Sequence, residues 1–264
     1  MAFLQCSFHS DVLGRACSMN VILPQKVTTQ IGMTSSGGGN RRYPVLYLLH
    51  GLSDDHTIWS RRTSIERYAA EYELAVVMPD GERGFYTDMM QGPRYWTMLT
   101  EELPAIAASF FPISTRREDT YVAGLSMGGY GALKCALRLP ERYAAAVALS
   151  SVADVRSWLE TCRMNREEAT RIFGTVKDLI PGRNDLFALA EETVKLASPP
   201  RLMMVCGTED GLLDANRALR AHLESLHYPG FRYEEGPGAH SWEFWDHWIV
   251  EGLKFLMEGR SDVR

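Results

Sequence analysis

The segment Gly124-Leu125-Ser126-Met127-Gly128 spaces a serine between two glycines, as a nucleophilic serine requires. It follows an apolar run, residues 121–123, and precedes a helix-forming stretch, residues 132–139. Glycines 128, 129 and 131 fall where the first turns of a helix belong, and each costs ~0.5 to 1 kcal/mol relative to alanine. Such a local conflict commonly marks a functional site. The pattern favours a nucleophile at a strand-to-helix turn over a purely structural glycine turn.

A serine hydroxyl needs a base to take its proton, and His240 is the best-placed of the seven histidines. It ends the flexible stretch Gly236-Pro237-Gly238-Ala239, after the last expected strand and before a helix. The other six histidines fit ordinary surface or core positions, except that the backbone of His50 is of more interest than its ring. They are His9, His50, His56, His222, His227 and His247. The sequence Ser53-Asp54-Asp55-His56 suggests a metal only weakly, because it is short and has no distant ligand. No metal is expected.

A serine and a histidine that act together in this way need a third residue to form a catalytic triad. This third residue is a carboxylate that lies between the serine and the histidine in sequence. Asp210 follows the apolar run 202–205 and is the preferred candidate. It would hold one tautomer of His240 and stabilise the imidazolium. Glu209 is a close competitor, because one residue changes the direction of the side chain, whereas Asp214 is more simply a helix N-cap.

A tetrahedral intermediate also needs two N–H donors. The amide of Met127 stands at a helix N-terminus, where unpaired N–H groups favour developing negative charge. His50-Gly51-Leu52 follows an apolar strand, at the place where a fold with this serine turn supplies a second donor. We assign that role to the amide of Leu52.

Short apolar runs alternate with helical stretches, which predicts an α/β fold with a mostly parallel central sheet flanked by helices. Residues 2–8 and 17–23 are expected to form an opening antiparallel pair. Further strands are expected at 45–49, 74–78, 121–123, 144–149, 203–206 and 231–234, with a closing helix at 241–257. The charged stretch 151–199 has no clear strand and is expected to form a small helical cap inserted between late strands. Residues 1–264 then make a single domain.

Composition excludes several classes of protein. The chain has 264 residues, 45% hydrophobic and 23% charged, with a net charge of −5, which argues against a nucleic-acid binder. No apolar run is long enough to cross a membrane, and the N-terminus lacks the pattern of a signal peptide. The five scattered cysteines suit a reducing, cytoplasmic compartment. The glycines of the loop at 28–42 lack the following Lys-Ser/Thr of a phosphate cradle.

Several motifs along nearly the whole chain together resemble a known family. They are Leu49-His50-Gly51-Leu52, Val77-Met78-Pro79, Phe85-Tyr86-Thr87-Asp88, Glu101-Glu102-Leu103-Pro104, Gly124–Gly131, Cys206–Asp210 and His240-Ser241-Trp242-Glu243-Phe244-Trp245. In this order they resemble the esterase D-like branch of the α/β-hydrolases, and most closely the bacterial tributyrin esterases.

The resemblance implies an α/β-hydrolase fold and cofactor-free hydrolysis of small short-chain acyl esters, acetyl to butyryl. It also implies a triad of Ser126, Asp210 and His240, with oxyanion donors at Leu52 and Met127. Trp59, Tyr86 and the cap are implied as pocket-lining, although core packing is the preferred reading for Trp59. The resemblance also favours a homo-oligomer.

Two departures from the family bear on the shape of the pocket. Gly211-Leu212-Leu213 stands where relatives tend to place a large aromatic residue, and the cap matches them least. They leave the acyl and alcohol preferences open. Three alternative functions are also kept: an S-formylglutathione hydrolase-type thioesterase, an acyltransferase with a sugar acceptor, and a catalytically silent binding protein. Activity is expected to fall between pH 8 and pH 5, because a protonated imidazole cannot act as a base.

Overall fold

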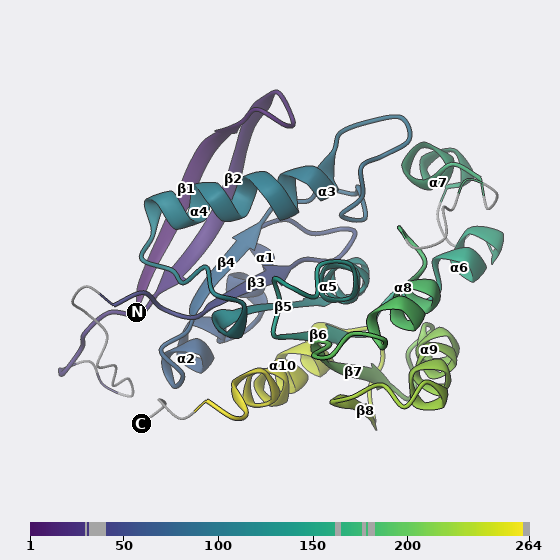
Figure 1. Cartoon of the computed structure of the whole chain (residues 1–264). Coiled ribbons are helices and arrows are strands. Elements are labelled where there is room, and N and C mark those ends of the chain that lie inside the picture. The colour runs from purple at the N-terminus through teal and green to yellow at the C-terminus, as the bar shows by residue number, and fades with distance from the viewer. Residues whose placement is uncertain (30, 32–40, 162–164, 176–177, 179–182, 261–264) are drawn as a thin grey trace.

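A twisted sheet of eight strands forms the centre of the molecule (Figure 1). The computed structural model describes residues 1–29, 31, 41–161, 165–175, 178 and 183–260. The strands are β1 (Ala2–Ser10), β2 (Arg15–Leu23), β3 (Val45–Leu49), β4 (Ala75–Pro79), β5 (Thr120–Leu125), β6 (Ala145–Leu149), β7 (Arg201–Gly207) and β8 (Phe231–Gly236). Their order across the sheet is β1-β2-β4-β3-β5-β6-β7-β8.

The direction of the strands confirms the predicted fold class. β1 and β2 form the expected antiparallel hairpin, and β2 pairs antiparallel with β4. Every other junction, from β4 through β3, β5, β6 and β7 to β8, is parallel. The carboxyl ends of these six strands therefore meet at one edge of the sheet, which is where ligands bind in open α/β sheets.

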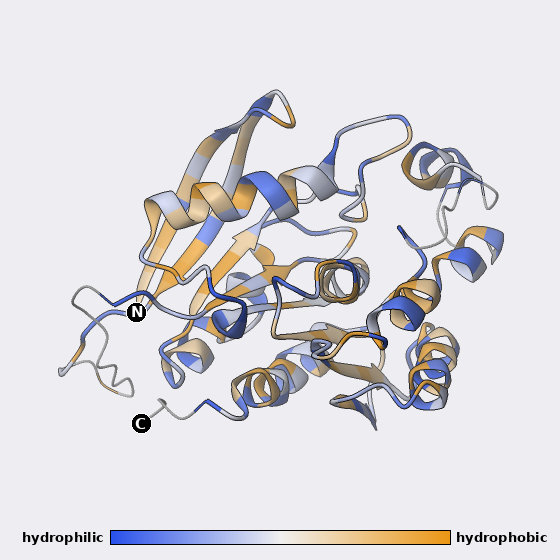
Figure 2. Cartoon of the chain, viewed as in Figure 1, coloured by the Kyte–Doolittle hydropathy of each residue, from blue (hydrophilic) through white to orange (hydrophobic). Residues whose placement is uncertain are grey.

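Helices cover both faces of the sheet. On one side lie α1 (Ile58–Arg62), α2 (Ile65–Ala70) and α10 (Trp242–Met257). On the other lie α3 (Tyr95–Thr97), which continues through a π-type turn (Met98–Glu102) into α4 (Leu103–Phe110), together with α5 (Met127–Arg138), α8 (Leu186–Thr193) and α9 (Leu213–Ser225). Figure 2 shows the apolar colouring gathered on the strands between these two layers.

The central strand β3 shows why both layers are needed. All five of its residues are buried. Because successive side chains point to opposite faces, Val45, Tyr47 and Leu49 enter one hydrophobic core while Leu46 and Leu48 enter the other. A continuous apolar run is typical of a strand that is covered on both sides.

Among the described residues, three helices lie between β6 and β7: α6 (Val155–Thr161), α7 (Arg166–Phe173) and α8. The α7 helix is tied to the loop after β4, since Glu168 pairs with Arg83 and the Ile172 carbonyl accepts from the Met90 N–H at 3.1 Å. Helix α8 packs against α5. The insertion expected at 151–199 is thus helical in its described parts; residues 162–164, 176–177 and 179–182 lie outside the described residues.

Other sequence expectations have different outcomes. Residues 30 and 32–40 of the loop expected at 28–42 lie outside the described residues. Cys6, Cys17, Cys135 and Cys206 are free thiols, and Cys162 is outside the described residues. Among the helices that the structure describes, none has the length and apolarity needed to span a membrane.

Candidate active site

Ser126 occupies the sharp turn between β5 and α5. Its backbone torsions are φ 54° and ψ −117°, and a positive φ is uncommon for a residue that is not glycine. The turn is held because the Ser126 N–H donates to the Leu149 carbonyl at 2.8 Å, and its own carbonyl accepts from Tyr130 and Val152. Backbone strain of this kind persists only where the surroundings fix it. The turn leaves the side chain of Ser126 half-buried at the carboxyl edge of the sheet.

Two glycines make this turn possible. A Cβ atom on Gly124 would lie 2.4 Å from the carbonyl of Gly128, and one on Gly128 would lie 2.4 Å from the Leu49 carbonyl oxygen. Both are far inside van der Waals contact with backbone that cannot move aside. Glycines on either side of the serine therefore allow the strand and the helix to cross this closely.

The structure brings Ser126, His240 and Asp210 together. His240 Nε2 lies 3.1 Å from Ser126 Oγ, and His240 Nδ1 lies 2.9 Å from Asp210 Oδ2. Since a carboxylate only accepts hydrogen bonds, Nδ1 carries the proton and the lone pair of Nε2 faces the serine hydroxyl. Serine, imidazole and carboxylate thus form one continuous hydrogen-bonded chain that can withdraw the serine proton.

The carboxylate of Asp210 is held in a buried, fully bonded state. Its side chain is 1% exposed, against 38% for His240. Oδ1 accepts the Leu212 N–H at 2.8 Å, and Ser150 adds a side-chain hydrogen bond. Burial acts to raise the pKa of Asp210, but the bonds from His240, Leu212 and Ser150 outweigh it, so the pKa is lowered. Asp210 is therefore an anion at neutral pH.

Glu209, the competing carboxylate, has a different set of partners. It accepts from the Gly238 N–H and, at 2.7 Å, from the Thr208 hydroxyl. The Glu209 N–H in turn donates to the Gly238 carbonyl at 3.0 Å. Glu209 therefore fastens the loop that carries His240, while Asp210 contacts the imidazole.

Ser150 and Trp245 support the site and were not identified from the sequence. Ser150 is fully buried at the end of β6, with φ 46°, and its Oγ accepts the Trp245 indole N–H at 3.1 Å. The Trp245 ring stands perpendicular to His240, with centroids 4.8 Å apart. A signal for Ser150 was available: it is a polar residue directly after an apolar strand, at the same sheet edge as Ser126.

The residues assigned as oxyanion donors lie at the ends of neighbouring strands. Met127 is the first residue of α5, so its N–H has no intrahelical partner. Leu52 follows β3, and its orientation depends on the His50 ring. His50 Nε2 accepts from the Gly81 N–H at 2.9 Å, which leaves Nδ1 to donate to the Gly51 carbonyl at 2.7 Å. Because a peptide is planar and trans, fixing the Gly51 carbonyl also fixes the Leu52 N–H.

Trp59 and Tyr86 hold the end of β3 rather than forming an exposed wall. Trp59 is 1% exposed and donates its indole N–H to the Leu49 carbonyl at 3.0 Å. Tyr86 is 0% exposed and donates its hydroxyl to the His50 carbonyl, also at 3.0 Å. The core position preferred for Trp59 agrees with this placement. Direct contact of either residue with substrate stays a prediction.

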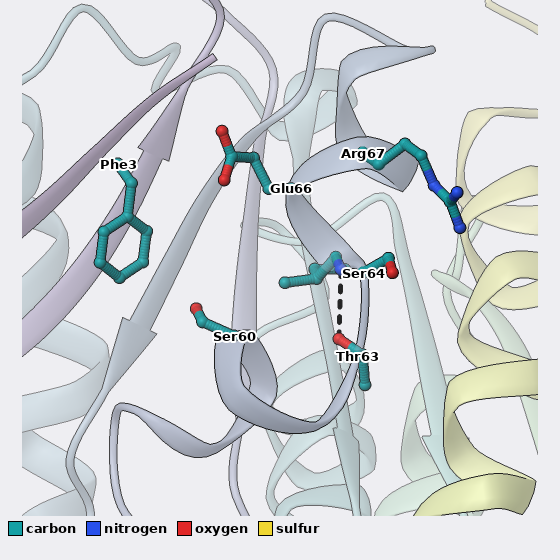
Figure 3. Close-up of a pocket in the computed structure, with 7 residues that line it drawn as sticks. Phe3, Ser60, Thr63, Ser64, Glu66 and Arg67 are labelled. Carbon is teal, nitrogen blue, oxygen red and sulfur yellow. Dashed lines mark hydrogen bonds between the residues drawn. The ribbon is translucent and has the colours of Figure 1, made fainter. Parts of the chain in front are cut away.

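A surface hollow of about 280 Å³ lies elsewhere, between β1 and the α1–α2 region (Figure 3). Phe3, Ser60 and Glu66 surround it, and the Ile65 N–H donates to Thr63 Oγ1 at 3.2 Å on its rim. None of the Ser126, His240 and Asp210 side chains lines this hollow. Within the residues that the structure describes, no group of three or more His, Cys, Asp or Glu side chains could hold a metal.

The fold and the neighbours that share it define a serine hydrolase of the α/β-hydrolase class. The most similar solved structures include the fluorophosphonate-binding serine hydrolase FphF of Staphylococcus aureus, substrate bound: TM-score 0.86, 32% identity, covering 97% of this chain and 98% of that one. The S-formylglutathione hydrolase FrmB of Staphylococcus aureus matches with TM-score 0.83 and 32% identity, over 97% of this chain and 99% of that one.

Within that class, the chain belongs to the family described as "Putative esterase", whose model matches residues 10–256. An acetyl esterase of Caldicellulosiruptor saccharolyticus is 30% identical over 264 residues, covering 97% of this chain and 98% of that protein. These findings confirm the resemblance to the esterase D-like branch. The protein is a carboxylic ester hydrolase.

Proposed function

We propose that the protein is a serine carboxylesterase that cleaves small acyl esters with short chains, acetyl to butyryl, through Ser126, His240 and Asp210. The observation that carries the proposal is the hydrogen-bonded chain from Asp210 through His240 to the strained Ser126. The acetyl esterase relative supports a short acyl group. We also propose that the enzyme works in the cytoplasm, as the free thiols favour.

The reaction proceeds in two halves. Ser126 Oγ bonds to the acyl carbon while His240 Nε2 takes its proton, and the resulting oxyanion is stabilised by the N–H groups of Leu52 and Met127. The carbon–oxygen bond to the alcohol breaks as His240 returns the proton to the leaving alkoxide. Water then gives a proton to His240 and attacks the acyl-enzyme, and Ser126 regains its proton as the carboxylic acid leaves.

The test is a series of p-nitrophenyl esters from acetate to octanoate. We expect kcat/KM to be highest between acetate and butyrate and to fall for longer chains. Ser126→Ala should lower kcat by about 10⁴-fold or more, and a fluorophosphonate probe should label the wild type but not this variant. Equal labelling of both proteins, or no hydrolysis of any ester, would refute the proposal.

An S-formylglutathione hydrolase is the second candidate, because FrmB is 32% identical over nearly the whole chain. Both candidates use the same serine, so only the substrate separates them. Comparison of kcat/KM for S-formylglutathione with that for p-nitrophenyl acetate decides between them. A clear preference for the thioester would replace the short-chain oxoester as the assigned substrate and leave the serine mechanism intact.

A further inference from the structure

Lys134 is a fully buried lysine on α5, two helical turns beyond Ser126. Its Nζ lies 2.9 Å from the Tyr86 carbonyl, 2.7 Å from Thr87 Oγ1 and 3.1 Å from Asn184 Oδ1. No carboxylate in the described part of the chain forms an ion pair with it. Lysine is almost never fully buried without such a pair, so the burial of Lys134 points to a functional role.

The segment that Lys134 contacts is a strained turn. Phe85 has φ 50° and Tyr86 has φ 48°, and bulky side chains rarely adopt this region, least of all at two successive residues. Two side-chain bonds hold it: Lys134 donates to the Tyr86 carbonyl, and the Thr87 hydroxyl donates to the Phe85 carbonyl at 3.1 Å. Without Lys134, the Tyr86 carbonyl loses its buried donor, and the turn loses one of the two side-chain hydrogen bonds that hold it.

Tyr86 carries the effect of this turn to the end of β3. Its ring fills a narrow slot, since a Cβ atom on Gly81 or Gly131 would come within 2.4 and 2.5 Å of it. The hydroxyl of Tyr86 donates to the His50 carbonyl, and the His50 ring donates to the Gly51 carbonyl. The amide of Leu52 belongs to the same peptide as that Gly51 carbonyl. A continuous set of contacts therefore joins Lys134 to this amide.

We propose that Lys134 is a positioning residue for ester hydrolysis: its amino group fixes the Phe85–Tyr86 turn so that Tyr86 holds the backbone presenting the Leu52 N–H to the oxyanion. The proposal rests on the proposed function. Lys134 never touches the substrate. Its third contact, Asn184, lies in the segment before α8. The Asn184 carbonyl also accepts from the Tyr130 hydroxyl at 2.9 Å.

The first test compares Lys134→Met with Lys254→Met, which removes an exposed lysine paired with Glu251. Rates are divided by the concentration of active sites, titrated with a fluorophosphonate, so that misfolded protein does not count. We expect Lys134→Met to lower kcat for p-nitrophenyl acetate about 10-fold with KM little changed, a fraction of the ~10² to 10³ lost with a whole oxyanion donor. Lys254→Met should match the wild type.

The second test follows the route through the Tyr86 hydroxyl. Tyr86→Phe keeps the ring but removes its bond to His50, so Lys134→Met should cause little further loss of kcat in that background. Losses that multiply in the double variant would show that Lys134 acts by another route, and would overturn the proposal. A merely structural role predicts changes in thermal stability and titrated sites without a change in kcat per site.

If Lys134→Met yields no folded protein, Thr87→Val and Thr87→Ser replace it. Valine removes the oxygen that Lys134 contacts and serine keeps it, so kcat per site should be lower for valine than for serine. Equal kcat values would overturn the proposal. Failure of the proposed function is distinguishable: it shows as absent ester hydrolysis, or no probe labelling, in the wild type itself.

Discussion

The imidazole of His240 stands edge-on to the indole of Trp245, with ring centroids 4.8 Å apart and planes at 90°. The same indole donates its N–H to Ser150, and Ser150 in turn bonds Asp210. Trp245 therefore contacts the His240 ring directly and reaches Asp210 through the Ser150 hydroxyl. Helix α10, which carries Trp245, begins two residues after His240, so the helix and the imidazole of His240 are positioned together.

Trp245→Phe should weaken catalysis modestly by removing the indole N–H while keeping an aromatic ring beside His240. One hydrogen bond contributes about 1 kcal/mol, which corresponds to about a 5-fold loss in kcat/KM. Trp248→Phe is the matched control, because Trp248 is half-buried on the same helix and packs on Phe244. Both variants are assayed with p-nitrophenyl acetate. Equal rates for the two variants would contradict a role of the indole N–H.

Gly128→Ala should destabilise the protein, because the added Cβ would lie 2.4 Å from the Leu49 carbonyl oxygen. Inserting one methyl group into a packed site costs about 1–3 kcal/mol. Gly129→Ala is the control, since its Cβ would approach backbone only to 3.2 Å. Urea unfolding measures both. The prediction fails if Gly128→Ala is as stable as Gly129→Ala.

The sequence was sufficient for the parts of the fold and site that have local signals. The expected strands agree with the observed ones to within a few residues at each end, and their shared edge brings Ser126, Asp210 and His240 together as predicted. Each of the three follows a buried strand or lies in a glycine-rich turn, so its immediate neighbours in the chain reveal it. The short helices α1 and α2 span too few residues for a periodic pattern, and none was predicted there.

The supporting contacts could not be predicted, because they join residues far apart in sequence. Ser150 and Trp245 are 95 positions apart, and Lys134 reaches partners 47 to 50 positions away. The His50 ring accepts from the Gly81 N–H, 31 positions away, and this contact leaves its other nitrogen to bond the Gly51 carbonyl. The neighbours of a residue in sequence do not reveal which distant backbone group its side chain will contact.

Ester hydrolysis should fall as pH drops from 8 to 5, because a protonated imidazole cannot act as a base. Imidazole is the side chain that ordinarily changes charge in this range. Asp210 does not take part, because its pKa is lowered: its contribution to stability is present at neutral pH and is lost only as pH falls through that depressed pKa.

The pH profile of kcat/KM for p-nitrophenyl acetate tests this, together with far-ultraviolet circular dichroism to confirm that the protein stays folded at pH 5. One protonation should describe the fall. A flat profile between pH 8 and pH 5 would exclude His240 as the base. A fall steeper than one proton allows would show that a second group in the site titrates.

Lys134 should give the protein a stability that rises with pH above neutrality. Burial, with a further contribution from Arg138, lowers the pKa of Lys134 to about 7 from 10.5. Between these values the unfolded chain binds a proton that the folded chain does not, so the free energy of unfolding increases by up to about 1.4 kcal/mol per pH unit. This contribution to stability is fully present above the pKa that Lys134 has in the unfolded chain. It is lost as pH falls through the pKa that Lys134 has in the folded protein.

Urea unfolding of the wild type and Lys134→Met at pH 7, 8 and 9 isolates this contribution, because every other titrating group is common to both proteins. The wild type should gain stability relative to the variant at each step. Lys254→Met should keep the wild-type slope, since Lys254 is exposed. Parallel stability profiles for the wild type and Lys134→Met would mean that the buried amino group keeps its proton through this range, and that the three acceptors around it hold a charged ammonium.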